Sequence, residues 1–377
     1  MKYAQLFIFF FSAVLIQNTV AAQQTHSRNL ILITLDGLRW QEVFEGADSA
    51  LLFNDEFVKD KSVRQQLWHS DFRKRREMLL PFFWKVIARD GQLLGNRKYG
   101  NQINCANPHW FSYPGYSEML TGVVDGRVRS NDTLENVNAT VLEFIHGHED
   151  FAGKVAAFTT WDVFPYILRE KKSGVPVNAG DEKATGDLSD AEILLNELQD
   201  LIPNPHGSRF DAFTFFLAFE YLKRANPRVL FIGMDETDEH AHGGRYDDYL
   251  KSAHRADYML QRLWNWIQSH PQYRDQTTLL ITTDHGRGKG ARHAWRSHGR
   301  LTFGSGQIWL AAIGPDTPPL GELKFPYQVY QKQIARTLAA FLGLDYRTDR
   351  KAAAEPIDIL FYSPELEASL RAAGSAR

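Results

Sequence analysis

The sequence has 377 residues and a mass of 43.2 kDa, which suits one large domain or two ordinary ones. With 44% hydrophobic and 23% charged residues it has the composition of a globular protein, which excludes a disordered or fibrous chain. A formal net charge of −2 gives no case for a basic nucleic-acid-binding surface. Cys105 is the single cysteine, so any metal must be held by oxygen and nitrogen atoms rather than by sulfur.

The N-terminal segment has the order of a secretory signal. Lys2 precedes an apolar run from Leu6 to Ile16, and small residues lead up to Ala22. We therefore expect residues 1–22 to be a signal peptide and the mature chain to be exported, to the periplasm or to the medium. The apolar run is too short to span a bilayer comfortably, so we expect no stable membrane insertion after cleavage.

Short apolar, β-branched runs recur along the rest of the chain, separated by segments with helical periodicity. This alternation predicts an α/β fold with a mostly parallel central sheet sandwiched by helices. We expect residues 23–377 to form a single domain with a helical insertion at about 48–100. The predicted strands are 29–35, 154–158, 228–233, 277–283 and 307–314, and the clearest predicted helices are 189–201, 246–269 and 330–344.

Carboxylates and imidazoles follow three of these predicted strands. Asp36 follows the first strand, Asp238 and His242 follow 228–233, and Asp284 and His285 follow 277–283. Ligands of parallel sheets gather beyond the carboxyl ends of the strands, so we expect these side chains to meet there. His298, in the glycine-rich segment that follows, can return to the same place. Carboxylates and imidazoles without a thiolate suit zinc, with manganese or iron as competitors.

Ser112 is the candidate nucleophile. It precedes Tyr-Pro-Gly, a turn that can present its hydroxyl at the N-terminus of a helix beginning near Gly115. Backbone N–H groups at such a terminus favour an anionic phosphoryl group. The alternative is that Ser112 or Ser117 only caps this helix.

The order and types of these motifs together resemble the alkaline phosphatase superfamily, most closely its branch of type I phosphodiesterases and nucleotide pyrophosphatases. The resemblance implies an alkaline phosphatase-like fold and two zinc ions. It also implies that Asp238, His242 and His298 bind one ion, and that Asp36, Asp284 and His285 bind the other. Ser112 would contact this second ion as the nucleophile.

Two features modify the resemblance. Sulfatases of this superfamily carry Arg two residues after the proline of the nucleophile motif, where this chain has Tyr116, which counts against sulfatase chemistry. In the phosphodiesterase branch, an asparagine about 20 residues after the nucleophile contacts the phosphoryl oxygen. Asn131 is the candidate for that role, and a residue of a surface turn is the alternative.

These features together predict an exported, metal-dependent hydrolase of phosphoric esters that acts through a phosphoseryl intermediate on a small-molecule phosphodiester or phosphomonoester. Lys98, Arg287 and Arg292 are cations that could contact the extra oxygen of a monoester. A sulfuric ester hydrolase and a non-catalytic metal-dependent binding protein are the alternatives. The sequence shows no nucleic-acid-binding surface, and it does not indicate the oligomeric state.

Overall fold

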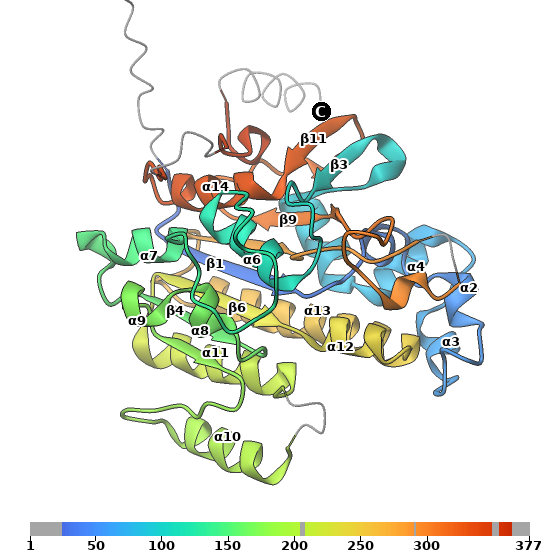
Figure 1. Ribbon diagram of the computed structural model, residues 1–377, viewed down its shortest axis with the longest axis horizontal. Helices are drawn as coiled ribbons and strands as arrows, with labels where there is room; N and C mark the ends of the chain where they lie inside the picture. The colour runs from blue at the N-terminus through green and yellow to red at the C-terminus, as the bar shows by residue number, and fades with distance from the viewer. Residues whose placement is uncertain (1–24, 204–207, 290–291, 349–353, 364–377) are drawn as a thin grey trace, which may run out of the picture.

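An eight-stranded sheet crosses the middle of the molecule, with helices on both of its faces (Figure 1). The computed structural model describes residues 25–203, 208–289, 292–348 and 354–363, so the expected signal peptide at 1–22 lies outside the described residues. The strands of the sheet are, in spatial order, β10 (Gly321–Glu322), β2 (Gln92–Leu94), β9 (Leu310–Ile313), β7 (Thr277–Thr282), β1 (Asn29–Leu35), β6 (Val229–Met234), β4 (Val155–Thr159) and β5 (Val177–Ala179).

The sheet is mostly parallel, as the alternation of strands and helices predicts. β1 pairs in parallel with both β6 and β7, which makes it a central strand, and β9 is antiparallel to both of its neighbours. The expectation of an α/β fold with a mostly parallel sheet between helices is therefore confirmed. All three strands that precede the candidate ligands lie side by side, so their carboxyl ends meet at one edge of the sheet.

The run at 307–314 differs from the prediction, because it forms two strands that belong to two sheets. β8 (Gln307–Ile308) pairs with β3 (Asn101–Asn104), and β3 also pairs with β11 (Tyr327–Tyr330), whereas β9 pairs with β7 and β2. Trp309 separates β8 from β9, and its indole N–H donates to the carbonyl of Leu38 at 2.7 Å. The chain changes partners at this tryptophan, which no local pattern predicts.

The two faces of the sheet carry two apolar cores because side chains alternate along each strand. In β1, Leu30 and Leu32 belong to one core, and Ile31, Ile33 and Leu35 belong to the other. Helices on the first face are α6 (Ser112–Thr121), α7 (Val141–His146), α8 (Phe164–Ile167) and α14 (Ile334–Phe341). Helices on the second face are α1 (Trp40–Glu45), α11 (Asp211–Ala225), α12 (Glu236–His242) and α13 (Tyr246–Ser269).

The segment at 48–100 packs on the second core and is only partly helical. Near its end it forms β2, which is a strand of the main sheet, so the segment also extends that sheet. Its helices and helical turns are α2 (Ser49–Leu52), α3 (Val63–Leu67), α4 (Phe72–Leu79), the π-helical turn η1 (Phe83–Ile87), α5 (Ala88–Asp90) and η2 (Arg97–Tyr99).

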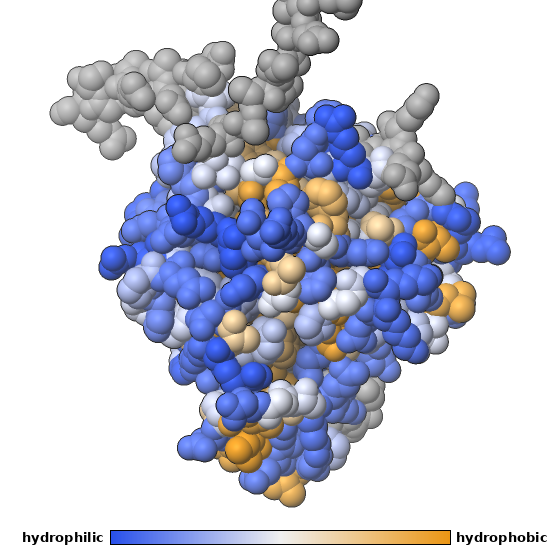
Figure 2. Space-filling model, turned by 90° about the vertical axis from the view of Figure 1, so that its left-hand side faces the viewer, coloured by the Kyte–Doolittle hydropathy of each residue, from blue (hydrophilic) through white to orange (hydrophobic). Residues whose placement is uncertain are grey.

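The remaining helical elements lie at the periphery or join strands to helices. They are η3 (Glu149–Phe151), α9 (Glu170–Ser173), α10 (Asp190–Leu201), η4 (Ala294–Arg296), η5 (Gln331–Gln333) and η6 (Asp358–Leu360). α10 projects from the lower end of the molecule, where Figure 2 shows apolar side chains on the surface. Leu194 and Leu201 of α10 are 53% and 77% exposed. Among the residues that the structure describes, no helix has the length and apolar character needed to cross a membrane.

Candidate metal centre and active site

The candidate ligands that follow three strands do meet at the carboxyl edge of the sheet. Asp36 directly follows β1, Asp238 is on α12 just after β6, and Asp284 and His285 come shortly after β7. Three overlapping groups of these and neighbouring side chains bring one oxygen or nitrogen atom per residue within 4.8 Å of one another. The groups are Asp238 with His285 and His298, Asp36 with Asp284 and His285, and Asp36 with Asp235 and Asp238.

His285 lies at the junction of the two ligand sets expected from the sequence. Its Nε2 atom is 3.4 Å from Asp36 Oδ1, 3.4 Å from Asp284 Oδ2 and 3.8 Å from Asp238 Oδ1. Its Nδ1 atom is 2.9 Å from the carbonyl oxygen of Gly286, a bond that leaves Nε2 to face the carboxylates. The side chain is buried, and burial is the main cause that lowers the pKa of His285 well below its usual value. A neutral imidazole is the form that binds a metal ion.

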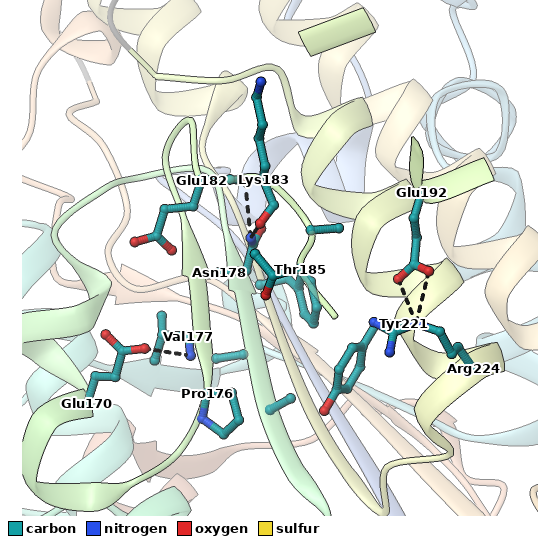
Figure 3. Close-up of a pocket in the computed structure, with 14 residues that line it drawn as sticks. Glu170, Pro176, Val177, Asn178, Glu182, Lys183, Thr185, Glu192, Tyr221 and Arg224 are labelled. Carbon is teal, nitrogen blue, oxygen red and sulfur yellow. Dashed lines mark hydrogen bonds and ion pairs between the residues drawn. The ribbon is translucent and has the colours of Figure 1, made fainter. Parts of the chain in front are cut away.

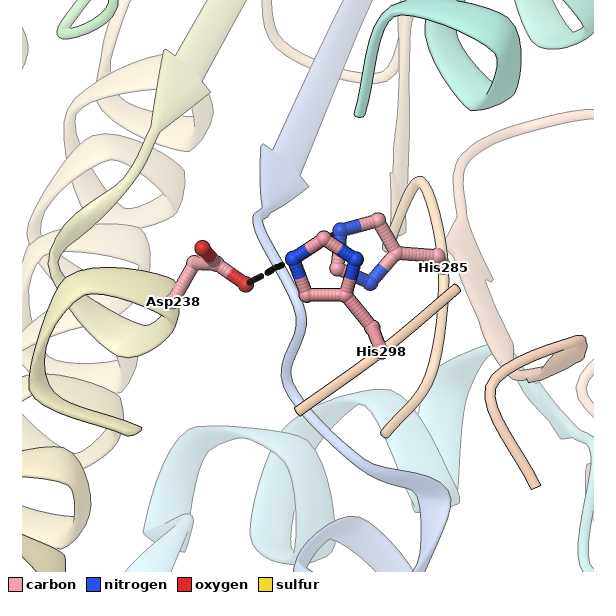
Figure 4. A group of neighbouring side chains, drawn as sticks. All are labelled: Asp238, His285 and His298. Carbon is pink, nitrogen blue, oxygen red and sulfur yellow. Dashed lines mark ion pairs between the residues drawn. The ribbon is translucent and has the colours of Figure 1, made fainter. Parts of the chain in front are cut away.

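The other expected set forms on α12 and the loop after β7. Asp238 and His242 are one helical turn apart, with Oδ2 and Nε2 at 3.1 Å. His298 Nε2 is 2.8 Å from His242 Nε2 and 3.7 Å from Asp238 Oδ1. Figure 4 shows the His285 and His298 rings lying one over the other beside Asp238. All six residues expected as ligands are thus brought together, and their role in binding metal stays a prediction.

Two buried carboxylate oxygens in this cluster have no hydrogen-bond partner. They are Asp36 Oδ1 and Asp284 Oδ2, the same atoms that face His285 Nε2. An unpaired charge of this kind is costly to bury. Burial and the neighbouring carboxylates therefore raise the pKa of Asp36. Burial, together with the charge of Asp238, raises the pKa of Asp284 to about 8. A divalent cation would satisfy both oxygens, so the residues present fit a metal site.

Asp36 and Asp284 are also fixed by partners outside the cluster. The Tyr116 hydroxyl donates to Asp36 Oδ2 at 3.0 Å, and the Gly37 N–H donates to Asp284 Oδ1 at 3.2 Å. Gly37 has φ of +60°, and a Cβ there would lie 2.6 Å from Asp238 Oδ1. Glycine is therefore required at this position, both for its backbone conformation and for the close approach of Asp238.

Ser112 lies beside this cluster. Its side chain is largely buried, and its Oγ atom is 3.5 Å from His285 Nε2. α6 begins at Ser112 itself, so the expectation of a helix start near Gly115 is wrong by one turn. The Pro at position 114 accounts for the earlier start, because proline is favoured in the first turn of a helix, where its missing N–H is not needed. Phe111, and not Ser112, occupies the N-cap position of α6, which counts against the capping alternative.

Asn131 lies at the same helix terminus. Its Oδ1 atom accepts a hydrogen bond from the Tyr113 backbone N–H at 3.0 Å. The side-chain amide is thereby held next to Ser112 even though the two residues are far apart in sequence. This contact brings Asn131 to the site, and its expected contact with a phosphoryl oxygen stays a prediction.

The structure adds two residues that the sequence did not single out as parts of the site, and it gives Arg287, considered from the sequence as a cation for a monoester, another partner. Asp235 groups with Asp36 and Asp238, Tyr116 donates to Asp36, and Arg287 forms an ion pair with Asp238. Asp235 stands three residues before Asp238 at the start of α12, so its position after β6 was the signal that could have found it. The partners of Tyr116 and Arg287 had no such signal, because these contacts depend on how α6 and the 286–306 loop fold back.

A separate cavity lies away from this centre. It has a volume of about 410 Å³ and is lined by residues near the edge strand β5, including Glu170, Asn178, Glu192, Tyr221 and Arg224 (Figure 3). Glu192 pairs with Arg224 at 2.9 Å, and Glu170 accepts the Val177 N–H at 3.1 Å. None of the expected site residues lines this cavity.

Comparison with solved structures identifies the fold. Wild-type alkaline phosphatase PafA superposes with a TM-score of 0.57 at 11% identity, over 91% of this chain and 100% of that protein. A protein in the alkaline phosphatase superfamily from Vibrio parahaemolyticus superposes with a TM-score of 0.51 at 12% identity, over 92% of this chain and 73% of that chain. This chain has the alkaline phosphatase fold. Inactive murine ectonucleotide pyrophosphatase/phosphodiesterase 5, in complex with AMP, superposes with a TM-score of 0.50 at 11% identity, over 84% of this chain and 96% of that chain. No protein-family model and no curated protein sequence matches the chain.

Proposed function

We propose that this protein is a two-metal hydrolase of phosphoric esters that prefers diesters and uses Ser112 as its nucleophile. The observation that carries the proposal is the position of Ser112 Oγ, 3.5 Å from His285 Nε2, at the first residue of α6 and beside unpartnered carboxylate oxygens. The alkaline phosphatase fold supports the same class of reaction, since PafA is an alkaline phosphatase and the murine relative carries AMP.

The two ligand sets suit two zinc ions, with manganese or iron as competitors. One ion would be held by Asp36, Asp284 and His285, and the other by Asp238, His242 and His298. When bound, the ions supply Lewis acidity that lowers the pKa of the Ser112 hydroxyl and offsets the negative charge of the phosphoryl group and the leaving oxygen.

Ser112 carries the covalent step. Its Oγ atom attacks phosphorus as the bond to the leaving oxygen breaks, the hydroxyl proton passes to solvent, and phosphorylated Ser112 forms, which still carries the second substituent of a diester. Water then attacks phosphorus, the bond to Ser112 Oγ breaks, Oγ regains a proton from solvent, and a phosphomonoester is released from a diester substrate. Asn131 has its Oδ1 atom bound to the Tyr113 N–H, so its amide hydrogens are oriented to donate to a nonbridging phosphoryl oxygen.

The three cations considered as contacts for a monoester each pair with a carboxylate of the protein, which favours a diester substrate. Lys98 pairs with Glu45 at 2.9 Å and Arg292 with Glu56 at 2.6 Å, while Arg287 is buried on Asp238. A monoester has a third phosphoryl oxygen that needs a donor, and a diester replaces this oxygen with a second substituent. The substrate is proposed to be a small molecule, met after export to the periplasm or the medium.

A sulfuric ester hydrolase is the second candidate, because that activity occurs on the same fold. Tyr116 stands where the sulfatase motif has arginine, and its hydroxyl is committed to Asp36. This arrangement favours the phosphoric ester.

The test compares zinc-loaded wild-type protein with the Ser112→Ala variant. Wild-type protein should hydrolyse bis-p-nitrophenyl phosphate faster than p-nitrophenyl phosphate and leave p-nitrophenyl sulfate unchanged. Ser112→Ala should lose activity by at least about a thousandfold and keep both ions by elemental analysis. Wild-type activity in this variant would remove Ser112 from its role, and sulfate hydrolysis would favour the second candidate.

A further inference from the structure

Arg287 is a buried arginine in direct contact with the metal-ligand cluster. It follows Asp284, His285 and Gly286 in sequence and is 1% exposed. Its Nη1 atom donates to Asp238 Oδ1, its Nε atom donates to the Trp295 carbonyl at 2.8 Å, and its Nη2 atom donates to the Arg296 carbonyl at 2.6 Å. Each of the three nitrogens is therefore engaged, and the guanidinium is held in place on one side of Asp238.

This contact places the arginine on an oxygen that also faces an expected ligand. Asp238 Oδ1 accepts from Arg287 and lies 3.7 Å from His298 Nε2, whereas Oδ2 lies 3.1 Å from His242 Nε2. The guanidinium charge therefore offsets the negative charge that Asp238 would offer a cation held in this set. An arginine is always charged at neutral pH, so the positive charge stays beside the carboxylate under all working conditions.

The two ligand sets consequently differ in charge. The set of Asp36, Asp284 and His285 has two carboxylates, and Asp36 Oδ1 and Asp284 Oδ2 have no hydrogen-bond partner. The set of Asp238, His242 and His298 has one carboxylate, and Arg287 offsets its charge. Attraction between buried charges is strong, so the first set attracts a divalent cation more strongly than the second.

We propose that the two metal sites differ in affinity and that Arg287 is the positioning residue that keeps the Asp238 site the weaker one. The proposal rests on the two-metal centre proposed above. The Asp36 site fills first and stays filled, while the ion at the Asp238 site exchanges with solution. Hydrolysis then depends on the concentration of free metal through the occupancy of the Asp238 site.

The test is a titration of chelator-stripped full-length protein with Zn²⁺, in competition with a chromophoric chelator. Wild-type protein should bind two ions in two separate steps. Arg287→Gln, which keeps a donor but removes the charge, should tighten the weaker step by about tenfold and leave the tighter step within twofold. Arg292→Gln is the matched control, because it removes an exposed arginine of the same loop and should leave both steps unchanged.

A second measurement needs no variant. A crystal of wild-type protein with one equivalent of Zn²⁺ should show anomalous density among Asp36, Asp284 and His285, and two equivalents should add a peak beside Asp238. The inference would be overturned if the two sites of the wild type had equal affinities, or if the first ion bound at Asp238. It would also be overturned if Arg287→Gln left the weaker step unchanged or loosened it. Binding of fewer than two ions would instead overturn the two-metal centre itself, so the two failures are distinguishable.

Discussion

Asp257 is a buried carboxylic acid of α13 whose side chain accepts hydrogen bonds from the backbone at the start of η1. Its Oδ2 atom accepts the Phe82 N–H at 2.8 Å and its Oδ1 atom accepts the Phe83 N–H at 3.1 Å. Burial raises the pKa of Asp257 to about 7, although both N–H groups act in the opposite direction. An aspartate in an unfolded chain has a pKa of about 3.9, so the folded protein keeps a proton that the unfolded chain releases.

The first prediction concerns stability against pH. Because the folded pKa is raised, the free energy of unfolding should fall as pH rises from about 4 to about 7, by up to about 4 kcal/mol from this group. Asp257→Asn removes the titration, so its stability should fall less over this range. The measurement is urea denaturation at pH 4.5 and 7.5. The exposed Asp187→Asn control should follow the wild type, and an equal fall in Asp257→Asn would contradict the assignment.

At the scale of elements, the approach of α6 to the end of β7 decides where Ser112 lies. Gly115 permits this approach, since a Cβ there would lie 2.5 Å from the Asp284 carbonyl oxygen. Gln331 also binds this carbonyl, through its Nε2 atom at 2.6 Å, so the carbonyl is held from two sides. α6 therefore cannot take a larger residue at this position without moving away from the ligand cluster.

The second prediction follows from this contact. Gly115→Ala should displace the start of α6, lower the activity by at least about tenfold and lower stability by about 1–3 kcal/mol. Steady-state kinetics and urea denaturation of the same preparation measure the two effects. Gly126→Ala is the matched control, because a Cβ at Gly126 meets no atom within 4 Å and should leave both quantities unchanged. Unchanged kinetics in Gly115→Ala would show that the close approach does not position Ser112.

At the scale of the whole molecule, the candidate metal centre joins distant parts of the chain, because its expected ligands come from the ends of β1, β6 and β7 and from the loop that follows β7. In the folded protein, burial and the neighbouring charge of Asp238 raise the cost of ionising Asp36, Asp235 and Asp284. Bound cations would compensate this cost, so metal binding and folding are expected to be coupled.

The third prediction is that chelation destabilises the entire fold. Removal of metal should lower the midpoint of thermal unfolding by roughly 5–15 °C, because an ion that binds only the folded state adds its binding free energy to stability. Differential scanning calorimetry measures this shift, and added Zn²⁺ should reverse it. Ser112→Ala should show the same shift, since Ser112 is not needed to hold the ions in the folded state. No shift in the wild type would mean that the cluster binds metal too weakly to matter.

The sequence by itself determined the buried strands, the class of fold and the residues after the strand ends. These are local signals: β-branched runs define β1, β6 and β7, and Asp36, Asp238 and Asp284 follow them within a few residues. Because neighbouring parallel strands end at the same edge of a sheet, strand prediction alone was enough to bring these side chains together.

The tertiary structure decided the contacts that depend on long-range folding. It placed β2 in the main sheet, divided the run at 307–314 between two sheets, and set Arg287 on Asp238 and Tyr116 on Asp36. Each of these contacts joins segments far apart in the chain, and the local sequence around one residue does not indicate which distant residue it will contact. Strand ends locate a site, but only the packing of helices and loops determines which charges surround it.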